Sequence, residues 1–197
     1  MAVKRNWDIL IIGGASGSGK TSISLPLARH YGVDLVRVDD FQMLLKAMTT
    51  PKTLPPLHYW DTHPNYRDEG VDAAVLRLID VGLAMMPGLK AVVDDHMLEN
   101  IPMVLEGDFI LPEFCASWGD KKVKSLFIHE PEREQILHNY LTREGELQEF
   151  RADVSHAYGA WLKESCRKYG ISVIEARPWG SLMERVLCVL NNKAGAV

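Results

Sequence analysis

The sequence predicts an α/β fold, a three-layer sandwich in which helices cover both faces of a parallel β-sheet. Short apolar runs of strand length alternate with stretches of helical periodicity over the whole chain. The runs are apolar at successive positions, which is typical of strands that are buried on both faces. Because the chain has 197 residues and no internal repeat, we expect a single domain that spans residues 1–197.

Composition and charge narrow the range of partners. Hydrophobic residues make up 47% of the chain and charged residues 24%, as in ordinary globular proteins. A net charge of −4 argues against nucleic acid or an acidic membrane as the main partner, since both require a basic surface. The first apolar run is too short for a signal peptide or a membrane span, and we expect a cytoplasmic protein. The cysteines are odd in number and lie in apolar surroundings, which predicts buried free thiols at Cys115, Cys166 and Cys188.

The first predicted strand, residues 7–12, leads into a glycine-rich loop. From Gly14 to Thr21 this loop matches the phosphate-loop pattern G-x-x-x-x-G-K-[ST], between a buried strand and a helix. Glycines let backbone N–H groups turn toward phosphate oxygens, and the helix adds the positive end of its dipole. Lys20 would reach the β- and γ-phosphates of a nucleotide, and the Thr21 hydroxyl would ligate Mg²⁺. The predicted nucleotide-binding residues here are Gly14, Ala15, Ser16, Gly17, Ser18, Gly19, Lys20, Thr21 and Ser22.

The helix after this loop is followed by a second predicted strand, residues 33–38, and by two adjacent acids. In open α/β sheets, ligands bind at the carboxyl ends of the strands. We therefore predict that Asp39, Asp40 and Phe41 contact the substrate. The alternative is that one of the aspartates caps a helix over residues 41–47, which is compatible with a role in the site.

Residues 50–67 are rich in proline, histidine and aromatic side chains and lack periodicity. A long stretch of this kind is typical of a functional loop, and its aromatic content argues against disorder. Two helices are predicted to follow, over 71–86 and, after Pro87, over 89–98, so that the substrate side covers about 41–100. The candidate contact residues of the loop are Tyr59, Trp60, Asp61, His63 and Arg67.

The third predicted strand, residues 102–105, ends at Glu106. An apolar strand that ends in an acid resembles a Walker-B element, whose carboxylate holds Mg²⁺ or orients the attacking group. This makes Glu106 a candidate metal ligand beside Thr21. Asp108 is a second candidate for the same role and a candidate substrate contact.

The fourth predicted strand, residues 124–129, precedes a helix and a charged connection over residues 142–151. Most charges of this connection are expected to be solvated. Arg143 and Arg151, however, are placed where a small lid over about 141–152 could close on the phosphates and stabilise the transferring group. Arg133 is the alternative lid arginine.

A helix, a fifth strand over residues 171–175 and a final helix complete the chain. Arg177 and Trp179 follow the fifth strand. Because the carboxyl ends of parallel strands meet at one edge of the sheet, we expect this segment to lie near the phosphate loop and the acids after the second and third strands.

Four segments resemble the uridine kinase and nicotinamide riboside kinase group of P-loop small-molecule kinases: residues 13–21, 39–41, 60–64 and 104–107. The resemblance covers about the first 110 residues. It implies a P-loop NTPase, nucleoside/nucleotide kinase-like fold with five strands in the order 2-3-1-4-5. A broader class of P-loop kinases, which includes relatives of 2-phosphoglycerate kinase, is similar as well. The chain departs from the nucleoside kinases at residues 89–98, where a helix is predicted in place of their β-hairpin.

The same resemblance implies roles for single residues. Asp39 would act as the base or orient the acceptor hydroxyl, while Thr21 and Glu106 would lie around Mg²⁺. Arg143 and Arg151 would belong to the lid. The loop after the fifth strand would pack against adenine, which implies contacts from Arg177 and Trp179.

The sequence thus predicts an ATP- and Mg²⁺-dependent kinase that phosphorylates a hydroxyl of a nucleoside-like or sugar-acid-like metabolite. Its catalytic residues would be Lys20, Asp39, Arg143 and Arg151. A nucleoside monophosphate kinase is an alternative, although only Arg67 and Arg77 lie between the second and third strands to bind an acceptor phosphate. A nucleotide-dependent regulatory NTPase without a small-molecule acceptor is another. A monomer and a homodimer both remain open.

Overall fold

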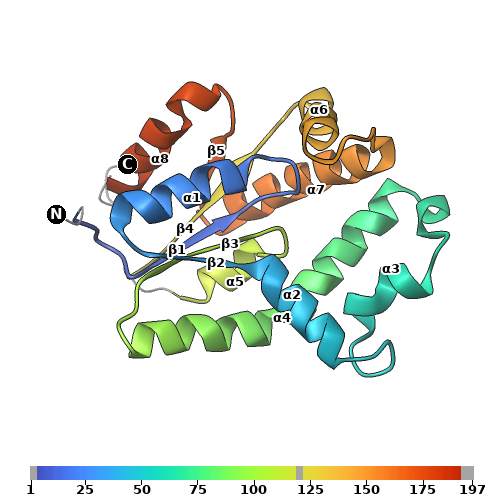
Figure 1. The fold of residues 1–197 in the computed structure, drawn as a ribbon, viewed down its shortest axis with the longest axis horizontal. Coiled ribbons are helices and arrows are strands. Elements are labelled where there is room, and N and C mark those ends of the chain that lie inside the picture. The colour runs from blue at the N-terminus through green and yellow to red at the C-terminus, as the bar shows by residue number, and fades with distance from the viewer. Residues whose placement is uncertain (1–3, 119–121, 192–197) are drawn as a thin grey trace.

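Five parallel strands form the centre of the molecule in the order β2-β3-β1-β4-β5 (Figure 1). The strands are β1 (Ile9–Gly13), β2 (Asp34–Arg37), β3 (Met103–Gly107), β4 (Val123–His129) and β5 (Ser172–Glu175). The structure is a computed structural model that describes residues 4–118 and 122–191, so that both ends of the predicted domain lie outside the described residues. The predicted α/β class and the implied strand order are confirmed.

Helices cover the sheet on both faces, as the apolar runs predict. Helices α1 (Lys20–Tyr31) and α8 (Leu182–Asn191) pack on one face, and α4 (Val71–Leu98), α5 (Pro112–Ala116) and α7 (Glu149–Lys168) pack on the other. The side chains of β1 alternate between the two layers, with Ile9 and Ile11 in one and Leu10 and Ile12 in the other, all four fully buried. Helix α6 (Arg133–Glu144) packs on α7 beyond the edge of the sheet.

The break predicted at Pro87 is wrong, because α4 is one continuous helix of 28 residues. Val81, Met85, Leu89 and Val93 are buried at intervals of four residues on both sides of the proline. The packing of this stripe outweighs the backbone hydrogen bond that the proline removes. No helix within residues 4–118 and 122–191 combines the length and the apolar character that a membrane crossing requires.

The segment between the second and third strands is more regular than expected. Helix α2 (Val38–Met48) begins directly after β2, and the loop that follows contains α3 (Tyr59–Thr62) and the short 3-10 turns Pro55–His58 and Tyr66–Glu69. Local hydrogen bonds build these turns, such as that from the backbone N–H of His63 to the carbonyl of Tyr59 at 3.0 Å. Single turns of this kind are too short to leave a periodic pattern in the sequence.

The prediction of buried thiols holds for Cys115 and Cys166 but is wrong for Cys188, which is exposed on α8. The core contacts of α8 come from Leu182, Val186 and Leu190, which lie on one face of the helix. Cys188 follows Val186 by two positions and therefore points away from that face.

The core on the α1 and α8 side should tolerate little loss of volume. We expect Leu10→Ala to lower the free energy of unfolding by about 2–5 kcal/mol, because Leu10 is fully buried and its truncation leaves a cavity. Leu76→Ala is the matched control: Leu76 is 58% exposed on α4, and its change should stay within about 0.5 kcal/mol. Urea unfolding followed by circular dichroism measures both. Equal losses in the two variants would contradict this assignment of the core.

Candidate active site

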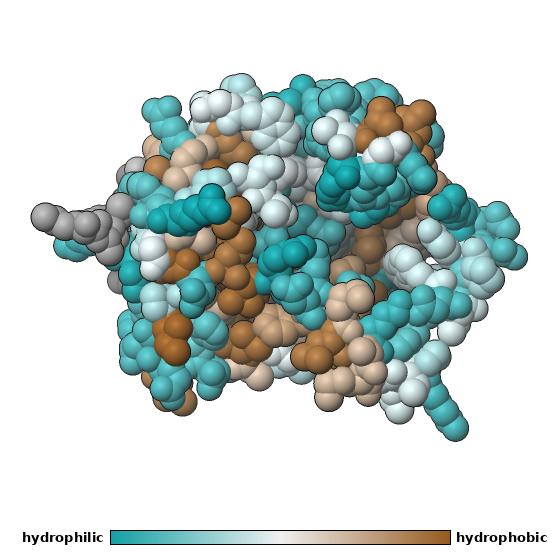
Figure 2. Space-filling model, in the orientation of Figure 1, coloured by the Kyte–Doolittle hydropathy of each residue, from teal (hydrophilic) through white to brown (hydrophobic). Residues whose placement is uncertain are grey.

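The carboxyl ends of the strands open into a cleft of about 900 Å³. It lies between the phosphate loop, the start of α2, the end of β3 and the polar face of α6. Figure 2 shows the surface hollowed between the α6–α7 side and the α2 side, with apolar residues visible in the recess. The cleft therefore lies where ligands bind in open parallel sheets.

Lys20 lies buried at the start of α1, directly under this cleft. Its Nζ donates a hydrogen bond to the Ala15 carbonyl oxygen at 3.2 Å and forms an ion pair with Asp108. Burial lowers the pKa of Lys20, but the charges of Asp108 and Glu106 outweigh burial and leave the pKa above its usual value. The lysine is therefore charged at neutral pH and is held by a carboxylate from the end of β3.

Glu106 is the last acid of β3 and is almost fully buried. The Thr21 hydroxyl donates to both of its carboxylate oxygens at 3.3 Å, and Arg37 Nε lies 3.7 Å from one of them. Burial raises the pKa of Glu106, Lys20 opposes this, and the nearby charge of Asp39 adds to it. Within the described residues, no group of three or more His, Cys, Asp or Glu side chains has the arrangement of a metal site.

The two predicted acids after the second strand have different positions. Both lie in the first turn of α2, for which Arg37 is the N-cap residue. Asp39 lines the cleft, whereas Asp40 does not line it, has a side chain that is 72% exposed and approaches Arg37 only at 4.0 Å. Burial and the charge of Asp108 raise the pKa of Asp39, against the opposing charges of Lys20 and Arg37. Phe41 packs against the core and does not line the cleft.

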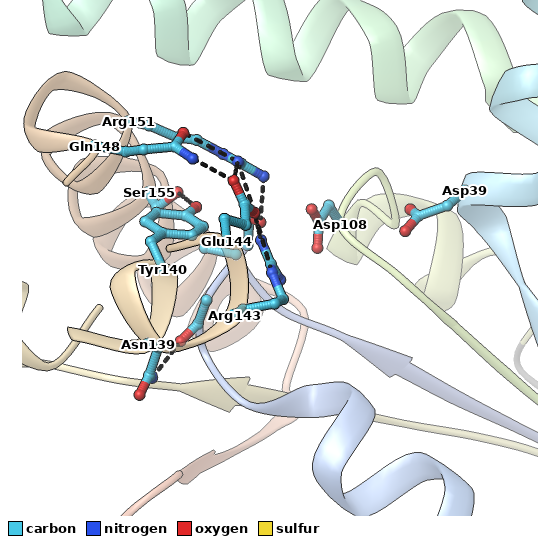
Figure 3. Close-up of polar contacts among 12 residues, drawn as sticks. Asp39, Asp108, Asn139, Tyr140, Arg143, Glu144, Gln148, Arg151 and Ser155 are labelled. Atoms are coloured by element: carbon cyan, nitrogen blue, oxygen red, sulfur yellow. Dashed lines mark hydrogen bonds and ion pairs between the residues drawn. The ribbon is translucent and has the colours of Figure 1, made fainter. Parts of the chain in front are cut away.

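The predicted lid is the turn between α6 and α7, and Figure 3 shows its charged side chains facing Asp108 and Asp39. Arg143 and Arg151 both line the cleft. Both also pair with Glu144, and Arg151 Nη1 lies 2.8 Å from one of its carboxylate oxygens. Arg151 reaches the phosphate loop as well, where Nη2 lies 3.4 Å from Ser16 Oγ. One carboxylate thus holds both predicted lid arginines.

Arg133, the alternative lid arginine, points elsewhere. It pairs with Asp153 at 2.7 Å and also with Glu134 and Glu149. The contacts tie the start of α6 to α7, and Arg133 does not line the cleft.

The sequence analysis missed the polar face of α6. Asn139 Nδ2 donates to the Gly17 carbonyl oxygen at 2.9 Å and so connects α6 to the phosphate loop. A pattern of polar residues at intervals of three and four, opposite buried apolar positions, could have indicated this face. The residues that line the cleft from it are Gln135, His138, Asn139 and Thr142.

Of the two residues predicted to contact adenine, the structure places one at the cleft and the other outside it. Trp179 lines the cleft and covers Gly19, where a Cβ atom would lie only 2.3 Å from the indole ring. Gly19 also has a φ of +88°, a backbone conformation that residues with a side chain rarely adopt. Arg177 does not line the cleft and instead binds the buried carboxylate of Glu130 through two hydrogen bonds of 2.9 Å.

Only some of the predicted contact residues of the loop line a cavity. Trp60 and Arg67 line a second cavity of about 420 Å³ beside the cleft, together with Asp108. Tyr59 donates its hydroxyl hydrogen to Glu69 and stacks on His63 at 4.2 Å between ring centroids. Asp61 pairs with Lys46 at 2.8 Å. Neither Tyr59, Asp61 nor His63 lines either cavity.

The second cavity meets the cleft at three shared residues, Ser16, Asp108 and Arg151. Its walls are mostly aromatic or aliphatic. Sequence reasoning did not assign Phe109 and Phe150 to this cavity, because Phe109 lies in the turn after β3, Phe150 lies near the start of α7, and the sequence does not fix how these segments meet. The apolar lining residues are Trp60, Tyr66, Ala74, Leu78, Phe109, Phe150, Val154 and Tyr158.

Curated kinases of two kinds are distantly similar in sequence. The 2-phosphoglycerate kinase of Methanothermobacter thermautotrophicus is 22% identical over 184 residues, which make up 85% of this chain and 60% of that protein. The mevalonate-3-phosphate 5-kinase of Thermoplasma acidophilum is 26% identical over 109 residues, 55% of this chain and 54% of that protein. The chain therefore spans less than two-thirds of the length of these relatives. No protein-family model matches it.

A solved structure decides the fold. Shikimate kinase from Acinetobacter baumannii, in complex with shikimate, matches with a TM-score of 0.58 at 14% identity over 97% of each chain. The chain has the P-loop kinase fold. The predicted fold class is thereby confirmed, and the resemblance to relatives of 2-phosphoglycerate kinase is found again in the curated sequences. The finer resemblance to the uridine kinase group stays a prediction.

The raised pKa of Asp39 predicts a pH-dependent gain in stability when its charge is removed. A carboxylate whose pKa is higher in the folded state destabilises the fold once the pH rises through that pKa. We expect Asp39→Asn to raise the Tm by about 1–3 °C at pH 7 and to leave it unchanged at about pH 2.5, where the aspartate is protonated in both the folded and the unfolded state. Differential scanning calorimetry measures the shift.

Asp40→Asn is the matched control, because Asp40 is the exposed neighbour on the same turn and should leave the Tm unchanged at either pH. An equal gain in both variants would show that general surface charge, and not the cleft, is responsible.

Proposed function

We propose that this protein is an ATP- and Mg²⁺-dependent kinase that transfers the γ-phosphoryl group to a hydroxyl of a small acidic metabolite. The observation that carries this proposal is the arrangement around Lys20. The phosphate loop places the lysine at the end of the cleft, and Asp39, Glu106 and Asp108 surround it from two neighbouring strand ends. A phosphate-binding loop beside a carboxylate that faces an open cavity is suited to phosphoryl transfer.

The nucleotide would bind with its phosphates on the phosphate loop and the start of α1. Backbone N–H groups and the helix dipole favour anions there. Lys20 would exchange its ion pair with Asp108 for the β- and γ-phosphates. Trp179 lies against the same loop and offers an aromatic face at the cleft.

Mg²⁺ fits between the Thr21 hydroxyl and the Glu106 carboxylate. The ion is usually held by one or two carboxylates together with nucleotide phosphates and water, and not by a complete protein cage. The direct hydrogen bonds from Thr21 to Glu106 show that both groups reach the same point. When held by Thr21 and Glu106, Mg²⁺ would supply positive charge against the charge that develops on the phosphates.

Asp39 would accept the proton of the acceptor hydroxyl. As the hydroxyl oxygen forms its bond to the γ-phosphorus, the bond from that phosphorus to the bridging oxygen breaks, ADP leaves, and the proton passes to the Asp39 carboxylate. Its raised pKa makes it a better base than an ordinary aspartate. Arg143 and Arg151 line the cleft from the lid, where they would stabilise the transferring group.

The comparisons support a hydroxy acid as acceptor. The names of these two kinds of curated kinase refer to phosphorylated hydroxy acids, and the matched solved structure holds shikimate, a ring-shaped hydroxy acid. This supports the sugar-acid-like alternative more than the nucleoside-like one.

Transfer of label from [γ-³²P]ATP with Mg²⁺ to pools of hydroxy acids, nucleosides and nucleoside monophosphates tests the proposal. We expect one hydroxy-acid pool to be labelled, and Lys20→Ala to reduce the rate at least about 100-fold, since the lysine neutralises the transferred phosphates. Lys46→Ala is the control, because Lys46 pairs with Asp61 outside the cleft. Steady ATP hydrolysis without any acceptor, unchanged by all pools, would instead favour the regulatory NTPase.

The lid gives a second prediction. Arg151→Gln should lower kcat by about 100-fold or more, because a guanidinium that reaches the phosphate loop is lost from the transition state. Arg167→Gln on the same helix is the control, since Arg167 is 82% exposed and pairs only with Glu164 among the described residues. Steady-state kinetics at saturating ATP measure both. If the two variants are equally active, Arg151 has no part in transfer.

A further inference from the structure

We propose that the acceptor is a hydroxy acid with a ring or another bulky apolar body and one anionic group, bound in the second cavity with its hydroxyl directed past Asp108 into the cleft. This inference rests on the proposed function and narrows its substrate class. It also separates this chain from its curated relatives, whose names refer to phosphorylated acids.

The walls of the second cavity favour an apolar body. Trp60 and Tyr66 stack at 5.9 Å between ring centroids, and Phe150 meets Tyr66 edge-on at 6.0 Å. A volume of about 420 Å³ accommodates a six-membered ring with substituents. A small polyol phosphate would leave these aromatic faces without contact, whereas a ring would fill the space between them.

The charges of the second cavity favour a single anionic group. Its cations are Arg67 and Arg151, and Arg151 is already paired with Glu144 at the mouth of the cleft. Arg67 lines the second cavity but not the cleft, and within the described residues it pairs with no carboxylate. Its only ring contact there is with Tyr66, at 6.0 Å from the centroid. A guanidinium of this kind binds one carboxylate with two hydrogen bonds.

A phosphorylated acid would bring about three negative charges into this space. Asp108 already adds one at the junction. Charges without partners beside aromatic walls are costly, so that the cavity discriminates against a second anionic group.

The junction between the two cavities, where they share Asp108, indicates the path of the acceptor hydroxyl. Asp108 lines both cavities, whereas Asp39 lines only the cleft. The Tyr158 hydroxyl donates to the backbone carbonyl oxygen of Asp108 at 3.1 Å and so fixes this turn after β3. With its carboxylate at Arg67, the acceptor would extend its hydroxyl past Asp108 into the cleft, toward the γ-phosphate and the Asp39 carboxylate that takes its proton.

Binding measured by isothermal titration calorimetry, with Mg²⁺ and the non-hydrolysable ATP analogue AMP-PNP, tests this inference. The ring-bearing probes are mandelate, phenyllactate, shikimate and quinate. The matched controls are lactate, in which a methyl replaces the phenyl of mandelate, and phenylethanol, in which a methyl replaces its carboxylate. The phosphorylated probe is 2-phosphoglycerate.

We expect at least one ring-bearing acid to bind about 10-fold more tightly than 2-phosphoglycerate, and mandelate to bind more tightly than either matched control. Arg67→Gln should weaken that acid about 10-fold and leave the affinity for AMP-PNP unchanged, because Arg67 does not line the cleft. Trp60→Leu should weaken it as well, while the affinity for AMP-PNP again stays the same.

Tighter binding of 2-phosphoglycerate than of all four ring-bearing acids, or an unchanged affinity in Arg67→Gln, would overturn the inference. Failure of the proposed function has a different signature. In that case AMP-PNP does not bind or no acid is phosphorylated, whereas the order of affinities among the acids is measured without any transfer.

Discussion

The buried charge of Lys20 is the constraint on which the rest of the site depends. A buried ammonium group requires compensation, and three carboxylates from the ends of two strand-to-helix segments supply it. Burial, and then the repulsion between these carboxylates, raises the pKa of Asp39 and of Glu106. Lys20 therefore lies among three carboxylates, and in the proposed function the nucleotide phosphates and a metal ion would replace part of this pairing.

The topology of the sheet produces this balance. Strands β2 and β3 are neighbours, and β3 lies beside β1, so that the acids after β2 and β3 converge on the loop after β1. Their register pairs Arg37 with Glu106 and Gly13 with Gly107 across neighbouring strands. Gly107 has no room for a side chain, since a Cβ atom would lie 2.4 Å from that of Val38. Close contact between the strand ends thus brings the three acids within reach of one lysine.

Much of this arrangement could be predicted from the sequence, because local patterns determine it. The phosphate-loop pattern and the acids at strand ends located Lys20, Thr21, Asp39 and Glu106 at one edge of the sheet. The sequence could not separate Asp39 from Asp40, since only the start of α2 at Val38 decides which of the two faces the cleft. The second cavity could not be predicted from the sequence for a similar reason. Its walls come from five segments, and their meeting depends on the packing of α4 against α7.

Two carboxylates, Asp108 and Glu144, hold the cations that a nucleotide would require. Asp108 pairs with Lys20, and Glu144 pairs with Arg143 and Arg151. Each pair satisfies charges that would otherwise lie unpaired in the open cleft, and each can exchange its carboxylate for a phosphate without exposing a bare charge. The exchange would release Asp108 at the junction with the second cavity, where the proposed acceptor would pass its hydroxyl into the cleft. Under the proposed function, the exchange of ion pairs that binds the nucleotide would therefore also prepare the acceptor site.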